Sequence, residues 1–80
     1  MDELGIRTAI LDELARLQPG KTQCPSYIAR QMADDWRPLM EPVRAVARQL
    51  AREGTVVVTQ RQRQLSPDEH WHGPIRLSLV

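Results

Sequence analysis

The amino-acid sequence predicts an α+β fold in which three helices precede a two- or three-stranded β-hairpin. Apolar residues at helical spacing occupy three segments of the first two-thirds of the chain. A β-branched run and an alternating apolar segment follow at 55–60 and 74–79, as expected of strands. Because three short helices leave apolar faces uncovered, the hairpin supplies the layer that completes the core. This is the element order of a winged helix-turn-helix domain.

The first helix is expected at residues 3–17. Asp2 suits the N-cap position, where its carboxylate can accept a backbone N–H bond. The apolar positions recur at helical spacing: Ile6, Ile10, Leu14 and Leu17. Pro19 and Gly20 follow and end the helix.

The second helix is expected at residues 25–33, after a short extended segment at 21–24. The segment is extended because Pro25 disfavours helical backbone at the residue before it. Pro25 itself suits the first position of a helix, where its missing N–H is not needed. Asp34 and Asp35 then mark the helix end, since the helix dipole disfavours negative charge there.

The third helix is expected at residues 40–53. Pro42 is tolerated only within the first turn, so placing it third makes Leu39 the N-cap. Gly54 follows as the left-handed terminator. One side of this helix forms an apolar seam with Leu39, Val43, Val46 and Leu50. The opposite side carries charge, with Glu41, Arg44, Arg48 and Arg52.

The segment 61–73 between the two strands is long, polar and interrupted by Pro67 and Gly73. It is expected to form an extended wing loop rather than a tight turn. With 80 residues, the chain is long enough for one domain, expected to cover 1–80.

The composition favours a soluble cytoplasmic protein. Cys24 is the single cysteine, so no intramolecular disulfide can form. Its side chain is expected to be buried as a small apolar group. No apolar run approaches the roughly 18 residues needed to cross a bilayer. The first residues include acidic side chains and lack the pattern of a signal peptide.

Several short motifs are similar to those of a known family. They are spread over nearly the whole chain, at 22–26, 28–30, 36–37, 39–40, 43–44, 59–60 and 73–76. On these residues the chain resembles a small bacterial winged-helix family catalogued as a domain of unknown function. The resemblance implies a winged-helix fold and brings no established activity with it. This chain departs from the family pattern at Gln62, where a glycine is expected soon after Thr59-Gln60.

Charge is unevenly distributed along the chain. Residues 1–35 hold four basic and six acidic side chains, a net −2, whereas residues 36–80 hold seven and four, a net +3. The basic residues of the second part are all arginine, which suits phosphate and base-edge contacts. The second helix of a helix-turn-helix enters the major groove, so the helix at 40–53 is the expected recognition helix.

These observations predict a nucleic-acid-binding protein, and DNA is the expected nucleic acid. The protein is expected to act as a small transcriptional regulator. The expected contact residues are Arg37, Glu41, Arg44, Arg48, Arg61 and Arg63. The alternative reading is an ordinary solvated helix face, on which Glu41 pairs with Arg44 or Arg48.

The far end of the wing loop suggests a second function. Asp68 and Glu69 would repel phosphates, and Trp71 lies beside them. Trp71 either folds back onto the core or serves as an exposed anchor for a protein partner or a second copy of the chain. The alternative function is therefore a protein-interaction module that uses the wing. Trp36, by contrast, is expected to pack beside Leu39.

No catalytic or metal-binding pattern stands out. The chain lacks a Ser/His/Asp ordering, a carboxylate pair and a glycine-rich phosphate loop, so no enzymatic activity and no cofactor are expected. His70 and His72 are two potential metal ligands without a nearby cysteine pair. No metal or small-molecule ligand is predicted.

Overall fold

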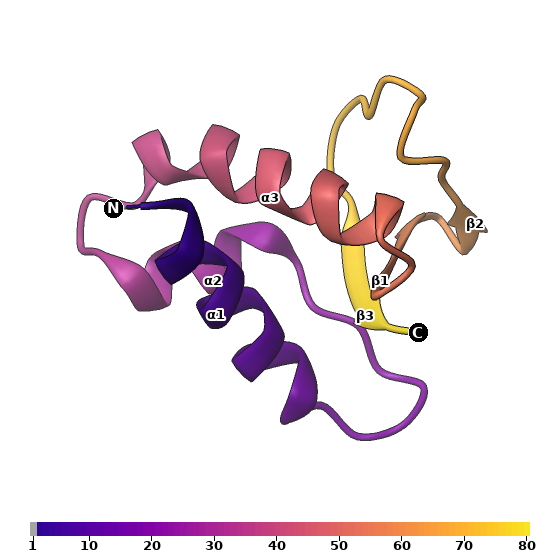
Figure 1. Ribbon diagram of the computed structural model, residues 1–80, viewed down its shortest axis with the longest axis horizontal. Helices are drawn as coiled ribbons and strands as arrows, with labels where there is room; N and C mark the ends of the chain where they lie inside the picture. Colours follow the sequence, from indigo (N-terminus) through magenta and orange to yellow (C-terminus); the bar gives the residue numbers. More distant parts are fainter. Residues whose placement is uncertain (1) are drawn as a thin grey trace.

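The computed structural model describes residues 2–80 and has the expected α+β class, with a helix-turn-helix followed by a β-hairpin wing (Figure 1). The helical elements are α1 at Glu3–Ala15, α2 at Pro25–Met32, a 3-10 turn η1 at Arg37–Leu39 and α3 at Met40–Arg52. The strands are β1 at Val56–Gln60, β2 at Arg63–Gln64 and β3 at Arg76–Leu79. The expected helices and the two expected strands are present, with ends that differ by one or two residues.

Local backbone constraints set the ends of the helices. The Asp2 carboxylate accepts the Gly5 N–H at 2.7 Å and caps α1 as expected. Leu39 is the N-cap of α3, which makes Pro42 its third residue. Gly54 adopts a φ of +80°, the left-handed conformation that ends this helix.

The sheet is antiparallel, with β1 in the centre of the order β2-β1-β3. Val58 pairs with Leu77 across β1 and β3. The segment 21–24 is extended as expected, and it joins the sheet through Gln23. Two backbone hydrogen bonds of 2.7 and 2.8 Å connect Gln23 with Leu77, so the residues before α2 protect the outer edge of β3.

The expectation of one long wing loop over 61–73 is wrong at its first residues. Arg61 and Gln62 form a two-residue turn with φ values of 52° and 71°, and the chain returns immediately as β2. Such hairpin turns normally contain Asn or Gly, because side chains disfavour a positive φ. Arg61-Gln62 therefore carries no sequence signal for the turn. After β2, Leu65 enters the core and donates its N–H to the Val58 carbonyl at 2.8 Å.

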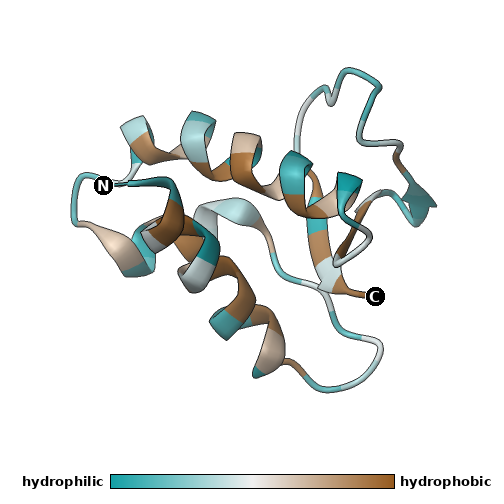
Figure 2. Ribbon diagram, in the orientation of Figure 1, coloured by the Kyte–Doolittle hydropathy of each residue, from teal (hydrophilic) through white to brown (hydrophobic). Residues whose placement is uncertain are grey.

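The core lies between the three helices and one face of the sheet. Figure 2 shows the hydrophobic side of α3 turned toward α1 and the sheet. Ile10, Ala47, Leu50 and Leu77 have no measurable exposure there. Trp36 and Leu39 are both partly buried against this core, as expected. Among residues 2–80 no helix has the length and apolar character needed to cross a membrane.

Candidate nucleic-acid interface

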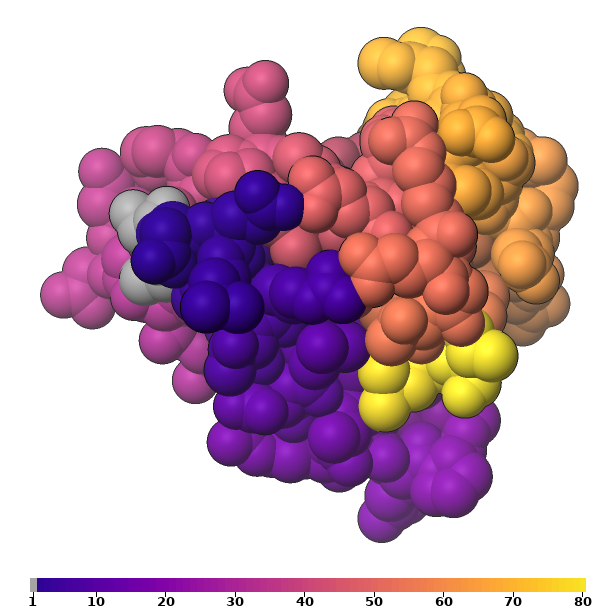
Figure 3. All heavy atoms as spheres, in the orientation of Figure 1, coloured from indigo at the N-terminus to yellow at the C-terminus, as the bar shows by residue number. Residues whose placement is uncertain are grey.

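The wing loop, defined here as residues 65–73, lies against the charged side of α3. Figure 3 shows its orange atoms in direct contact with the last turns of that helix. Arg44, Arg48 and Arg52 of α3 all donate hydrogen bonds to it. The loop therefore covers part of the side of α3 that the sequence predicts to be solvent-exposed, whereas Glu41 and Arg52 on that side stay exposed.

Arg48 makes the most extensive of these contacts. Its guanidinium lies 4.0 Å from the centroid of the Trp71 ring, a cation–π arrangement. The same group donates to the carbonyl of Glu69 at 2.9 Å and to that of Pro67. A guanidinium that binds carbonyls and an aromatic face in this way fixes the path of the loop.

Arg44 acts on the next part of the loop. It donates to the carbonyl oxygens of Trp71 at 2.9 Å and Gly73 at 3.2 Å. Burial lowers the pKa of the Arg44 guanidinium, and the positive charge of Arg48 lowers it further. Because an arginine stays charged in proteins, the cost of this partial burial is offset by the two carbonyl partners.

Arg44 and Arg48, both expected to contact nucleic acid, have partners within the domain. Both side chains are partly buried and bind main-chain carbonyls, so neither is presented freely to a base edge. Glu41 remains exposed and forms none of the ion pairs within residues 2–80, so the alternative in which it pairs with Arg44 or Arg48 does not hold there. The guanidinium groups of Arg44 and Arg48 instead donate hydrogen bonds to main-chain carbonyls of the wing loop.

Trp71 packs on the core, which settles one pair of alternatives. Its side chain is only 5% exposed, and its indole N–H donates to the Ser66 carbonyl at 2.9 Å. The expectation of an exposed Trp71 anchor for a protein partner is therefore corrected. The indole is held between Arg48 and the core, so it offers no surface for a hot-spot contact.

The acidic residues of the loop are paired with arginines. Arg63 donates to Glu69 at 3.2 Å, and Arg52 donates to Asp68 at 3.3 Å. The Ser66 N–H also donates to Glu69 at 2.7 Å, and this bond, together with Arg63, holds the pKa of the Glu69 carboxyl below its usual value. Arg63, which was expected to contact nucleic acid, is therefore paired with a carboxylate of its own domain.

Two predicted arginines, Arg37 and Arg61, are exposed and have no carboxylate partner within residues 2–80. The structure adds Arg30 and Arg76, which sequence reasoning missed, to this group. Arg30 and Arg37 lie 4.5 and 4.8 Å from the ring centroid of Trp36. The sequence signal for Arg30 was weak, because it belongs to the half of the chain with net negative charge.

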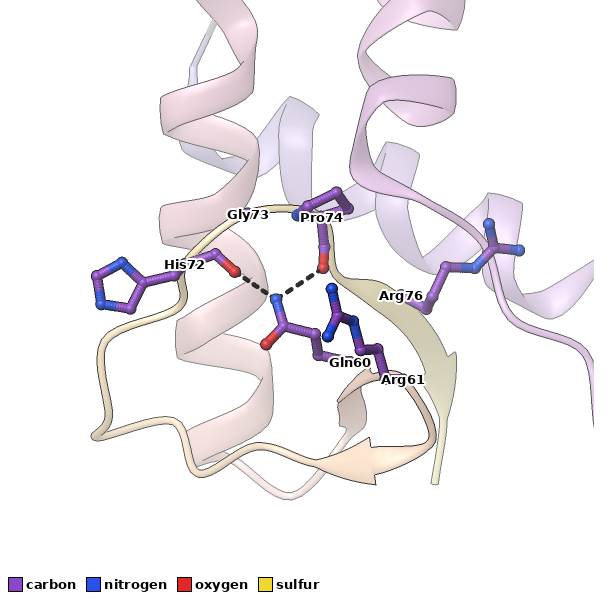
Figure 4. A pocket seen from close by; sticks show the side chains of 6 residues that line it. All are labelled: Gln60, Arg61, His72, Gly73, Pro74 and Arg76. Atoms are coloured by element: carbon purple, nitrogen blue, oxygen red, sulfur yellow. Dashed lines mark hydrogen bonds between the residues drawn. The ribbon is translucent and has the colours of Figure 1, made fainter.

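Arg61 and Arg76 line one hollow of about 520 Å³ at the base of the hairpin (Figure 4). Its wall is completed by Gly73 and Pro74, and the Gln60 amide donates to the Pro74 carbonyl at 3.0 Å. In Figure 4 the Arg61 side chain reaches toward Pro74, whereas that of Arg76 extends to the other side. Arg76 donates to both the hydroxyl and the carbonyl of Thr22 at 2.9 Å, which ties β3 to the segment before α2.

A second hollow of about 420 Å³ shares Gly73 and Pro74 with the first. Its remaining wall comes from the start of α2, from Ile75, and from Trp36, Met40 and Arg44. The two hollows and the arginines on Trp36 are therefore contiguous. We call this surface the basic face. It comprises the two hollows and four exposed arginines that form no ion pair within residues 2–80: Arg30, Arg37, Arg61 and Arg76.

Cys24 lies at the edge of the second hollow and is half-buried rather than fully buried. Burial raises the pKa of its thiol. The Ser26 hydroxyl, 3.2 Å from the sulfur, backbone hydrogen bonds and the charge of Arg76 together outweigh burial and lower that pKa below its usual value. No basic side chain hydrogen-bonds the sulfur within the described residues, so the arrangement lacks the partner base of a cysteine nucleophile.

His70 and His72 place their rings edge to face, with centroids 4.2 Å apart. In the part of the chain that the structure describes, no third histidine, cysteine or carboxylate joins them in a group able to hold a metal ion.

The comparison with protein families shows which family the chain belongs to. Residues 3–80 match the family described as a protein of unknown function, DUF3253, and the chain belongs to this family. A search of curated proteins finds no match to it. The family match covers the helices, the hairpin and every arginine of the basic face.

Proposed function

We propose that this domain binds nucleic acid, and DNA in the first instance, through the basic face. The observation that supports this proposal is the gathering of four exposed arginines around two adjoining hollows, none of them paired with a carboxylate in the described part of the chain. Arginine is the side chain best suited to bind phosphate, since its planar group donates two parallel hydrogen bonds.

The chain as a whole has a net charge of +1, but no acidic residue of the described chain lines either hollow of the basic face. Four of the acidic residues are neutralised in ion pairs with arginines outside the basic face, among them Glu53 with Arg7 and Glu13 with Arg16. The arginines left over are those of the basic face and the two that hold the wing loop. Binding by phosphate neutralisation then involves few contacts, so it is weak, and its salt slope is shallow, at about 0.9 per neutralised phosphate.

The proposal is tested by fluorescence anisotropy with labelled DNA over a series of salt concentrations. The double variant Arg37→Ala with Arg61→Ala should weaken binding and reduce the slope of log K against log salt by about two, one for each phosphate that is no longer neutralised. Arg16→Ala is the matched control, because Arg16 is exposed at the end of α1 and lines neither hollow of the basic face. Equal effects of the double variant and the control, or no binding at low salt, would contradict the proposal.

A further inference from the structure

We propose that the nucleic acid is bound as an unpaired strand, with one base held in the hollow beside Trp36. This inference rests on the proposed function and narrows its ligand to single-stranded nucleic acid. It follows from two relationships. The wing loop engages Arg44 and Arg48 of α3, and the basic face presents an apolar hollow between two pairs of arginines.

The first relationship concerns the width of α3. A bare α-helix with its side chains measures about 10–12 Å across and just fits the major groove, which is about 12 Å wide. Here the wing loop is fastened along α3 by Arg44 and Arg48. The wing loop adds a layer beside the helix at these two residues. Arg44 and Arg48 are therefore engaged within the domain and are not presented to the bases of a duplex.

The second relationship concerns the lining of the hollow. Pro25, Trp36, Met40 and Pro74 present mainly apolar surface, and its volume of about 420 Å³ lies in the range of small-ligand sites. Unpaired bases have flat apolar faces and polar edges, and proteins hold them against aromatic rings or guanidinium planes. The chemistry of the wall fits such a base.

A polar group is also available for the base edge. Arg44 lines the hollow, and its guanidinium has five N–H groups. Two hydrogen bonds go to the wing-loop carbonyls, so three N–H groups remain for acceptors on a base or a phosphate.

The position of the four arginines of the basic face argues for a strand rather than an apolar peptide side chain. Arg30 and Arg37 stand over Trp36 at one side of the hollow. Arg61 and Arg76 line the neighbouring hollow beyond Pro74. A base seated between these pairs has its two flanking phosphates near positive charge on both sides, which is the charge pattern of a single strand.

The experiment compares three fluorescein-labelled DNAs of equal length in one buffer: a mixed-sequence single strand, its duplex, and the single strand with abasic sites. The single strand should bind at least tenfold more tightly than the duplex. The abasic strand should bind about fivefold more weakly or worse, since stacking contributes about 1–3 kcal/mol per base. A single-stranded RNA of the same sequence tells whether the sugar matters.

A matched pair of methionine variants tests the hollow itself. Met40→Ala removes a wall of the hollow and should weaken single-strand binding by severalfold. Met32→Ala removes the same side chain from a partly buried site that lines neither hollow of the basic face, and it should leave binding unchanged. Circular dichroism and the fluorescence of buried Trp71 show whether both variants are folded.

The outcomes separate this inference from the proposed function. Tighter binding of the duplex, no effect of abasic sites, or equal binding by the two methionine variants would overturn the unpaired-base inference alone. Displacement of the strand by polyglutamate of equal charge as readily as by unlabelled strand would overturn it as well. Absence of binding to every nucleic acid would overturn the proposed function itself.

Discussion

The guanidinium of Arg48 lies over the ring of Trp71, 4.0 Å from its centroid, and joins the third helix to the wing loop. The contact buries an indole that the hairpin would otherwise expose, and it turns a surface arginine into a structural one. The same guanidinium donates to the Glu69 carbonyl at 2.9 Å. The position of residues 65–73 therefore depends on a side chain that belongs to α3.

Arg48→Ala should destabilise the domain by about 2–3 kcal/mol, because it removes charged hydrogen bonds and a cation–π contact together. Arg48→Lys keeps the charge but loses the planar group, so it should recover only part of this stability. Urea unfolding followed by Trp71 fluorescence, in a Trp36→Phe background, measures both. Arg52→Ala is the control on the same helix, since its exposed ion pair with Asp68 is worth at most about 1 kcal/mol. An equal loss from Arg52→Ala would disprove the structural role of Arg48.

Gln62→Gly should stabilise the domain. Gln62 has a φ of 71°, a conformation that costs a residue with a side chain roughly 1–2 kcal/mol and costs glycine little. Glycine also gains freedom in the unfolded chain, so the net gain is expected to be about 0.5–1 kcal/mol. Gln64→Gly, two residues further in β2, should have the opposite sign, because its backbone is already extended. Thermal unfolding of both variants measures the difference; a shift of the same sign in both would contradict this reading of the turn.

The wing loop should lose stability in acid through Glu69. The Ser66 N–H and then Arg63 lower the pKa of the Glu69 carboxyl in the folded state. A carboxyl with a lowered folded pKa stabilises the fold above its unfolded pKa of about 4.3, and this contribution disappears as the pH falls through the folded value. Glu69→Gln should therefore be less stable than the native chain at pH 7 and nearly equal to it well below pH 4. Glu41→Gln, at an exposed residue without an ion pair in the described chain, is the control. Urea unfolding at each pH gives the comparison, and parallel pH profiles for the native chain and Glu69→Gln would refute the assignment.

Two arginines of the hairpin should differ in nucleic-acid binding. Arg61 has no carboxylate partner in the described chain, whereas Arg63 is paired with Glu69 at 3.2 Å. Arg61→Ala should reduce the salt slope of binding by about one, and Arg63→Ala should change it much less. Anisotropy titrations at four salt concentrations provide the slopes. A larger effect from Arg63→Ala would mean that the ion pair opens on binding and that the free arginines are wrongly assigned.

The fold was largely predictable because its strongest signals are local. Pro42 and Gly54 bound α3, since a proline is restricted to the first turn and a glycine favours the left-handed terminator. The same reasoning fails at Arg61-Gln62, where the hairpin turns without a glycine or asparagine. There the pairing of β1 with β2 and the burial of Leu65 hold a turn that the local sequence does not favour.

The candidate site was predictable only in part. Arg37 and Arg61 are exposed as expected, while Arg44 and Arg48 are engaged with the wing loop. Helical spacing correctly placed the last two away from the apolar seam. It contained no information on whether another segment covers that side.

The order of the helices and strands, the ends of α3 and the positive charge of the second half follow from the amino-acid sequence, because each depends on neighbouring residues or on composition. Which arginines are free is a result of tertiary structure instead. The partners of Arg44 and Arg48 are main-chain carbonyls 19 to 29 residues further along the chain, and every residue has such a carbonyl, so no side-chain pattern announces the contact. Tertiary packing likewise decides that Trp71 is covered, because the wing loop folds back along α3, and it places Arg30 of α2 over Trp36 and Arg76 of β3 beside Thr22.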